Sequence, residues 1–304
     1  MIIKTWRDPY DAGFSPTKPK EIELKPGLTV LVGCNGAGKT TLLRNIKEHC
    51  DSAKIPCMMY DNLHDGGSNS VSSLFYSGDY ATGVSLWSSS EGECIKLNVG
   101  RNSANYKEFI QNGYVNDADY RLRKLFAGQD ENTIDVIDSK DRVFLFDAVD
   151  SGMSVDAVVE IKALFSMMID DKSASDRNLY IIIAANEYEL ARNSACFDVN
   201  AGRYIQFQDY EDYRKFIIKS RKLKETRLNQ QKKWRENQKQ KELKKYQKVL
   251  ARQIELLAPF KKKYGEDLEN VYGCDKYRIE DIQRSTKDFI RHSRFLTEED
   301  VKDI

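Results

Sequence analysis

Apolar residues recur in short runs along the first 210 residues of the chain, and polar or glycine-containing stretches separate them. Several runs are rich in β-branched residues and have the length of buried strands. Stretches at 41–46 and 155–169 follow two of these runs and indicate helices. Strands that alternate with helices predict an α/β fold, a mostly parallel sheet flanked by helices. The predicted strands are 1–6, 21–24, 28–32, 54–60, 143–147, 179–185 and 203–207, with a further helix around 119–126.

The pattern changes after the last of these strands. Residues 229–242 contain almost no apolar side chain except Trp234, which is typical of a solvated helix. Farther on, apolar residues recur at three- and four-residue steps, an amphipathic stripe that Pro259 is expected to end. The remainder is expected to be helical, more acidic and folded back on the basic helix. We divide the chain into a head at 1–210 and a helical, Lys/Arg-rich region at 211–304; the stripe comprises Leu243, Tyr246, Leu250, Ile254 and Leu257.

Charge is distributed unevenly along a chain that is nearly neutral as a whole. The 304 residues include 48 Lys and Arg against 47 Asp and Glu, a net charge of +1. Residues 211–263 hold 19 Lys and Arg against six Asp and Glu, a net charge of +13, which leaves −12 on the rest. Two interpretations stay open: a solvated helix that projects from the head or packs along it, or a basic arm for nucleic-acid phosphates.

Cysteine and histidine patterns exclude some kinds of site. The six cysteines are scattered without a C-x-x-C pair, and the three histidines lack metal-ligand spacing. This argues for reduced thiols and against a zinc cluster. No apolar run reaches membrane-spanning length, and the first residues lack the pattern of a secretory signal. We therefore expect a cytoplasmic protein without a membrane partner.

The sequence GCNGAGKT at 33–40 fits the phosphate-binding pattern G-x-x-x-x-G-K-[ST], between a predicted strand and a predicted helix. Glycines allow backbone N–H groups to face phosphate oxygens, and the helix N-terminus adds partial positive charge. Lys39 is expected to reach the β- and γ-phosphates of ATP, and the Thr40 hydroxyl to hold Mg²⁺. The alternative is a chance glycine turn before a helix. The predicted nucleotide-binding residues are Gly33, Asn35, Gly36, Ala37, Gly38, Lys39, Thr40 and Thr41.

The apolar run at 143–147 ends in an aspartate. In a P-loop protein such a strand places a carboxylate beside the Mg²⁺ that the P-loop hydroxyl also touches. Asp147 is therefore predicted to bind Mg²⁺ and, with Lys39, to belong to the catalytic group; an ordinary turn aspartate is the alternative. A tight turn at 150–154 follows, with Ser154 as the expected cap of the next helix.

A second group of small residues, Ser90-Glu91-Gly92-Glu93, precedes a predicted helix start. With the P-loop, the Asp147 strand and the 150–154 turn, it resembles ATPase heads of the ABC superfamily. The nearest branch is the RecF/SMC-like soluble one, P-loop ATPases of phage and bacterial-defence type. GCNGAGKTT is similar to that branch's G-x-N-G-x-G-K-[ST]-T, and the serine loop resembles the end of its L-S-G-G-[QE] signature. The resemblance covers about 1–210 and implies ATP, Mg²⁺ and a homodimer in which Ser90 and Gly92 of one head cap ATP on the other.

Three features depart from that family's pattern. Ala148 stands where a glutamate usually follows the aspartate, and Asn186 stands where a histidine is usual; the Q-loop glutamine has no clear match. Asparagine hydrogen-bonds a phosphate but does not titrate. Three alternatives stay open: slow hydrolysis, hydrolysis assisted by Asp150 or Glu187, or none. A water-positioning group contributes ~10²–10⁴-fold to the rate, so its loss leaves nucleotide binding intact.

Two functions follow as hypotheses. The first is an ATPase whose heads dimerise around ATP and act on DNA or a DNA-processing partner. The second is a hydrolysis-poor, nucleotide-gated scaffold or clamp that binds a partner protein such as a nuclease. The motor subunit of a membrane transporter is less favoured, because a basic helical region follows the head and Asn186 replaces the usual histidine.

Overall fold

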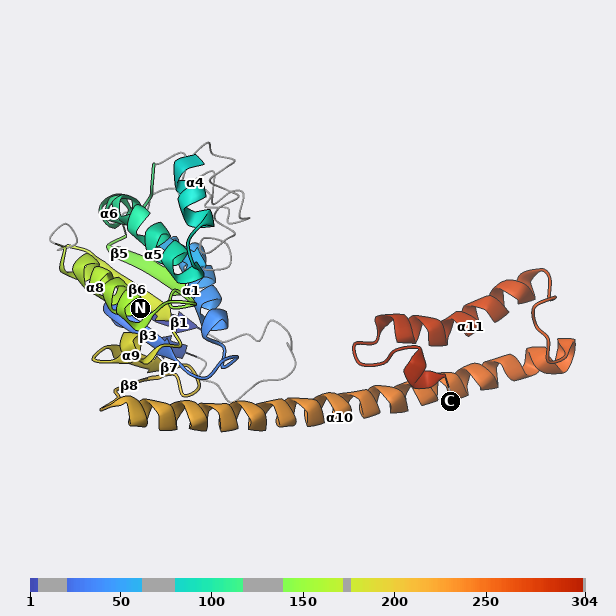
Figure 1. The fold of residues 1–304 in the computed structure, drawn as a ribbon. Coiled ribbons are helices and arrows are strands. Elements are labelled where there is room, and N and C mark those ends of the chain that lie inside the picture. Colours follow the sequence, from blue (N-terminus) through green and yellow to red (C-terminus); the bar gives the residue numbers. More distant parts are fainter. Residues whose placement is uncertain (5–20, 62–79, 117–138, 172–175, 303–304) are drawn as a thin grey trace. The chain divides into compact units, whose positions relative to one another are not determined.

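The structure is a computed structural model that describes residues 1–4, 21–61, 80–116, 139–171 and 176–302. The chain divides into two compact units, Met1–Lys224 and Glu225–Ile304 (Figure 1). The predicted helix at 119–126 lies outside the described residues.

A six-stranded sheet forms the centre of the first unit, in the order β4-β5-β6-β3-β7-β8. All neighbouring strands are parallel except β7 and β8, which confirms the predicted mostly parallel sheet. A separate antiparallel pair joins β1 (Ile2–Lys4) to β2 (Glu21–Glu23). The six strands are β3 (Gly27–Val32), β4 (Cys57–Asp61), β5 (Asp141–Asp147), β6 (Asn178–Ala184), β7 (Ala195–Asp198) and β8 (Arg203–Ile205).

Helices cover both faces of this sheet (Figure 1). Successive strand residues point to opposite faces: Phe144 and Phe146 pack in one apolar cluster, Val143 and Leu145 in another. The first cluster includes side chains of α5, α6, α8 and α9, and the second includes those of α1. The helices are α1 (Lys39–Ala53), α4 (Tyr80–Trp87), α5 (Glu91–Arg101), α6 (Ser103–Asn112), α8 (Val155–Asp170) and α9 (Tyr188–Ala191).

Three strand ends that carry candidate residues lie side by side. β6 pairs with β3 on one side and β5 on the other, and Ala184 at its end is opposite both Leu31 and Asp147. Because the three strands are parallel, the chain leaves all of them at the same edge of the sheet. The P-loop after β3, Asp150 after β5 and Asn186 after β6 are thereby brought to one place.

The second unit consists of helices. α10 (Tyr210–Tyr264) begins in the first unit and continues into the second, where α11 (Cys274–His292) and a short 3₁₀ helix (Glu299–Val301) follow. Phe295 packs edge-to-face on Trp234 and donates its backbone N–H to the Glu242 carboxylate, so the C-terminal segment folds back on α10 as predicted.

Pro259 does not end the basic helix, contrary to the prediction, because α10 continues to Tyr264. A proline inside a helix removes one hydrogen bond and strains one turn. Leu257 and Phe260, on either side of it, belong to a small core with apolar residues of and before α11. Burial of these side chains offsets the cost of the proline. The predicted stripe is only partly buried: Tyr246 and Leu257 are covered, whereas Ile254 is 61% exposed.

Candidate functional site

The P-loop takes the backbone conformation that its glycines permit. Gly36 and Gly38 have φ angles of 74° and 101°. Residues with a Cβ atom adopt such positive φ angles only with strain. Ala37 donates its N–H to the Cys34 carbonyl at 3.0 Å, which closes a tight turn. α1 begins at Lys39, and its first turn contains no acidic residue. The positive end of the helix dipole is therefore available to an anion.

Lys39 is the cation of the P-loop, and two hydrogen bonds hold its ammonium in place. Its Nζ donates to the Gly33 carbonyl and to Asn186 Oδ1, both at 2.9 Å, and the residue is 9% exposed. Burial lowers the pKa of its ammonium, and the negative charge of Asp150 opposes this shift. The strand ends after β3 and β6 thus hold one ammonium at the mouth of the P-loop.

Thr40 and Asp147 are joined by a side-chain hydrogen bond, so the two residues predicted to share Mg²⁺ lie next to each other. Thr40 Oγ1 donates to Asp147 Oδ1 at 3.1 Å, and Asp147 is 8% exposed. Burial raises the pKa of the Asp147 carboxyl, and the Thr40 hydrogen bond opposes this shift. A hydroxyl and a carboxylate oxygen are hard donors that suit Mg²⁺, which takes its other ligands from water and phosphate. The donor set therefore fits the expected ion.

Asp150 is fixed by the chain that follows β6. Its Oδ2 accepts the backbone N–H of Asn186 at 2.6 Å and that of Glu187 at 2.7 Å. The residue is 5% exposed, and Oδ1 has no hydrogen-bond partner among the described residues. One carboxylate oxygen is therefore anchored, and the other is buried without a hydrogen bond to any residue that the structure describes.

A family model fits this part of the chain. The model of the ATPase family associated with various cellular activities (AAA) matches residues 29–202, more than half of the sequence. The chain belongs to the AAA family of ATPases. The matched range contains the P-loop, Asp147, Asp150 and Asn186. Family membership implies nucleotide binding and ATPase activity. No significant match was found among curated proteins or solved structures.

The turn after β5 in this AAA ATPase offers no base directly after Asp147. Ala148 has a φ angle of 53° and donates its N–H to the Ala184 carbonyl at 3.2 Å. Ser154 stands at the N-cap position of α8, but its side chain makes no hydrogen bond to the helix N–H groups, so the expected cap is incomplete. Asp150 is thus the buried carboxylate of this turn.

Ser90 and Gly92 lie at the start of α5, where the predicted helix is confirmed. Ser90 forms a capping box: Ser90 Oγ accepts the Glu93 N–H, and Ser90 N–H donates to Glu93 Oε2 at 2.8 Å. The Ser90 N–H, and after it the Ser90 hydroxyl, which donates to Glu93 Oε2 at 3.0 Å, lower the pKa of the Glu93 carboxyl. A carboxylate already neutralises part of this helix N-terminus. Among the described contacts, this loop adjoins the 150–154 turn, where Ser151 Oγ donates to Glu91 Oε1 at 3.3 Å.

Replacement of Gly92 is expected to destabilise the head. A Cβ there would lie 2.4 Å from the Gly152 carbonyl oxygen and 2.8 Å from Met153 Cα, so Gly92→Ala should cost about 1–3 kcal/mol. Gly100, in the same helix, has nothing within 4 Å of its Cβ position, and Gly100→Ala should stabilise by roughly 0.5–1 kcal/mol. Denaturant titration of both variants tests this, and equal stabilities would contradict the close approach of α5 to the turn.

Asp147→Asn is expected to raise the thermal midpoint of the nucleotide-free protein by a few degrees. The folded-state pKa of Asp147 is raised, so the cost of burying its charge is present above that pKa and disappears as the pH falls below it. The gain should therefore be visible at pH 7 and shrink toward pH 4. Added Mg-ATP should raise the midpoint of the native protein by more than that of the variant, which keeps Lys39 and the P-loop but lacks one Mg²⁺ ligand. A lower midpoint for the variant at pH 7 would oppose this account.

Residues of α10 reach the P-loop and were not predicted. Ser220 and Lys224 each contact its backbone, and Tyr213 contacts the backbone of Asn186. Ser220 and Lys224 are 186 and 189 residues from their partners in the sequence, so no local pattern marks them.

Proposed function

We propose that this AAA ATPase binds Mg-ATP at the meeting point of β3, β5 and β6. The observation that carries the proposal is the set of three hydrogen bonds that Lys39 and Thr40 make at that point. Residues 33–41 receive the phosphates, Lys39 lies beside them, and Thr40 and Asp147 hold Mg²⁺. The ion would neutralise phosphate charge and orient the phosphates. Asn186, through the amide that now accepts from Lys39, is placed to contact a terminal phosphate.

We further propose that Asp150 positions the attacking water. Its Oδ2 is anchored by two N–H groups, whereas its buried Oδ1 is unpaired in the described part of the chain. A buried carboxylate oxygen with no hydrogen bond to these residues is suited to accept a proton from water. Ala148 has no such group. Glu187 is exposed, and its backbone, not its carboxylate, makes the bond to Asp150.

Within the P-loop ATPases, the ABC-like RecF/SMC-like branch remains our proposal, with 1–210 as the functional head and 211–304 as its helical extension. In that arrangement two heads close over two ATP molecules, and Ser90 and Gly92 act on the partner's nucleotide. Support comes from the close approach of Gly92 to Gly152, which puts the serine loop against the 150–154 turn. Closure would require Glu93 to release Ser90. The free state of all six cysteines supports a cytoplasmic location.

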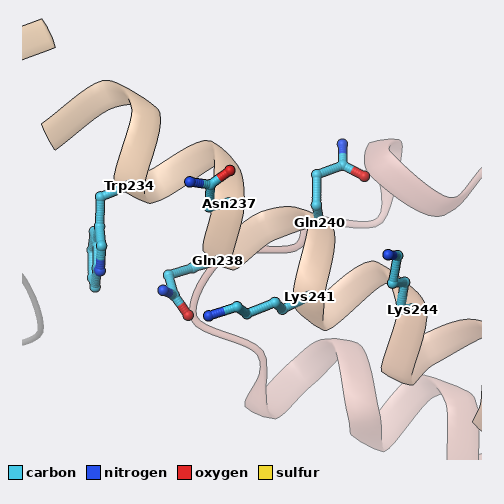
Figure 2. A pocket seen from close by; sticks show the side chains of 6 residues that line it. All are labelled: Trp234, Asn237, Gln238, Gln240, Lys241 and Lys244. Atoms are coloured by element: carbon cyan, nitrogen blue, oxygen red, sulfur yellow. The ribbon is translucent and has the colours of Figure 1, made fainter. Parts of the chain in front are cut away.

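DNA is the proposed target of the basic part of α10. Amide and ammonium groups follow one another along this helix beside an aromatic ring and line a shallow hollow, and Figure 2 shows these side chains. Such groups contact phosphates and bases of nucleic acid. The described helices include none long and apolar enough to cross a bilayer. The lining residues are Trp234, Asn237, Gln238, Gln240, Lys241 and Lys244.

The test is steady-state phosphate release with Mg-ATP, with and without duplex DNA, at several salt concentrations. We expect turnover that rises with DNA, and DNA affinity that falls steeply with salt because neutralised phosphates release counterions. Turnover without any response to DNA would leave the ATPase and remove the DNA proposal. DNA affinity that does not change with salt would contradict the role of the basic helix.

A nucleotide-gated scaffold is the second candidate function. Ala148 and Asn186 favour it, because neither side chain can act as a base. ATP would then close the two heads around a partner protein, such as a nuclease, with little hydrolysis. ATP-dependent dimerisation without phosphate release would support this function over the first.

A further inference from the structure

Side chains from the first turns of α10 hydrogen-bond to the backbone of the P-loop. Ser220 is 1% exposed, and its Oγ accepts the Cys34 backbone N–H at 3.0 Å and the Asn200 side-chain amide at 2.8 Å. A P-loop binds anions through N–H groups that point inward. Ser220 removes the Cys34 N–H from that set and fixes the direction in which the loop leaves β3.

Lys224 lies one helical turn after Ser220 and contacts the tip of the same loop. Its Nζ donates to the Asn35 carbonyl at 2.8 Å. A Cβ placed on Gly36 would lie 2.6 Å from this Nζ, so the ammonium occupies the space that a side chain there would need. Lys224 therefore holds a P-loop carbonyl away from the phosphate side and places a positive charge beside the loop.

Tyr213 makes the third contact, on the other strand end. Its hydroxyl donates to the Asn186 carbonyl at 2.7 Å, and its ring packs against Tyr188 and Phe207. Asn186 is also the residue whose side chain accepts from Lys39. Three residues of α10 thus contact the P-loop and the segment after β6, which together hold Lys39.

We propose that Tyr213, Ser220 and Lys224 of α10 form a nucleotide-responsive clasp, in which Lys224 is a positioning residue for the P-loop. The inference rests on the proposed nucleotide site and adds a regulatory element to it. Phosphates that fix the P-loop also fix Asn35 and Asn186, and so strengthen the seating of α10. The coupling is reciprocal. A second ligand that stabilises the contacts of α10 with the P-loop raises the affinity for ATP, and ATP raises the affinity for that ligand by the same factor.

The reach of this clasp follows from the continuity of the helix. α10 runs without a break from Tyr210 to Tyr264, so the contacts at 213–224 and the basic stretch belong to one element. A partner bound to the basic stretch would act on the nucleotide site by changing how firmly the first turns are seated. A single coupling free energy would then connect nucleotide binding with partner binding.

The experiment compares full-length Lys224→Met, Lys224→Arg and Lys219→Met. Lys219 is an exposed lysine of the same helix, so its variant removes an equal charge away from the P-loop. Affinity for a fluorescent ATP analogue with Mg²⁺ is measured by titration, and hydrogen exchange of amides 213–224 is followed with and without ATP. Thermal midpoints of the nucleotide-free variants show whether each is folded.

We expect Lys224→Met to weaken binding by roughly 10-fold, Lys224→Arg to restore most of it, and Lys219→Met to match the native protein. ATP should slow exchange at 213–224 in the native protein and have little effect in Lys224→Met, which a purely structural role would not produce. Native affinity and native exchange in a folded Lys224→Met would overturn the clasp and leave the nucleotide site standing. Absence of Lys39-dependent ATP binding in the native chain would overturn both proposals.

Discussion

Lys39→Ala is expected to abolish measurable ATP binding. The Lys39 ammonium is held by the Gly33 carbonyl and by Asn186 at the start of α1, where the P-loop amides converge. Truncation removes the one lysine charge inside this motif and leaves both acceptors without their donor. Hydrogen bonds to charged groups contribute about 1.5–3 kcal/mol each, so a weakening of at least 10²-fold is expected. Titration with a fluorescent ATP analogue and Mg²⁺ measures the loss.

Lys47→Ala is the matched control for this variant. Lys47 lies in the same helix and forms a surface ion pair with Asp51, which is worth about 0–1 kcal/mol. It removes the same charge and the same side-chain length two turns farther on. If Lys39→Ala and Lys47→Ala bound ATP equally well, the site assignment would be wrong.

The sequence predicts the sheet and the P-loop because the necessary information is local. The run 28–32 consists of leucine, threonine and valine, its last four residues are buried, and glycines are needed where Gly36 and Gly38 have positive φ angles. β7 was not predicted, because Ala195–Asp198 shows neither an alternation of polar and apolar residues nor an apolar run of strand length. The helix end predicted at Pro259 was wrong, because packing of Leu257 and Phe260 against residues in and before α11 outweighs a local helix-breaking preference.

The parts of the site that escaped prediction depend on distant contacts. Ser220 and Lys224 resemble other polar positions of a basic helix until the fold puts them against the P-loop. Ser90 shows the opposite difficulty: a serine followed three residues later by glutamate fits both a helix cap and a phosphate-binding loop. Within one chain the structure uses Ser90 as the cap.

Asp150→Asn is expected to impair ATP hydrolysis and to leave ATP binding largely intact. Asp150→Asn keeps the shape of the side chain and an oxygen that can accept the Asn186 and Glu187 N–H groups. It replaces the other oxygen, which has no partner among the described residues, by an NH₂ group. An amide cannot take a proton from water. We expect single-turnover hydrolysis to slow by about 10²–10⁴-fold, while ATP affinity changes only a few-fold. The two quantities are measured separately on the same variant.

Glu187→Gln distinguishes the two carboxylates available after β6 and β5. Its backbone donates to Asp150, and its exposed side chain is the alternative base. Loss of turnover in Glu187→Gln with normal turnover in Asp150→Asn would transfer the role to Glu187. Loss of ATP affinity together with turnover in Asp150→Asn would show that the carboxylate supports the binding geometry, through Lys39 and Asn186, instead of acting on water. Native turnover no higher than that of Lys39→Ala would leave Asp150 no reaction to assist, and would favour the nucleotide-gated scaffold.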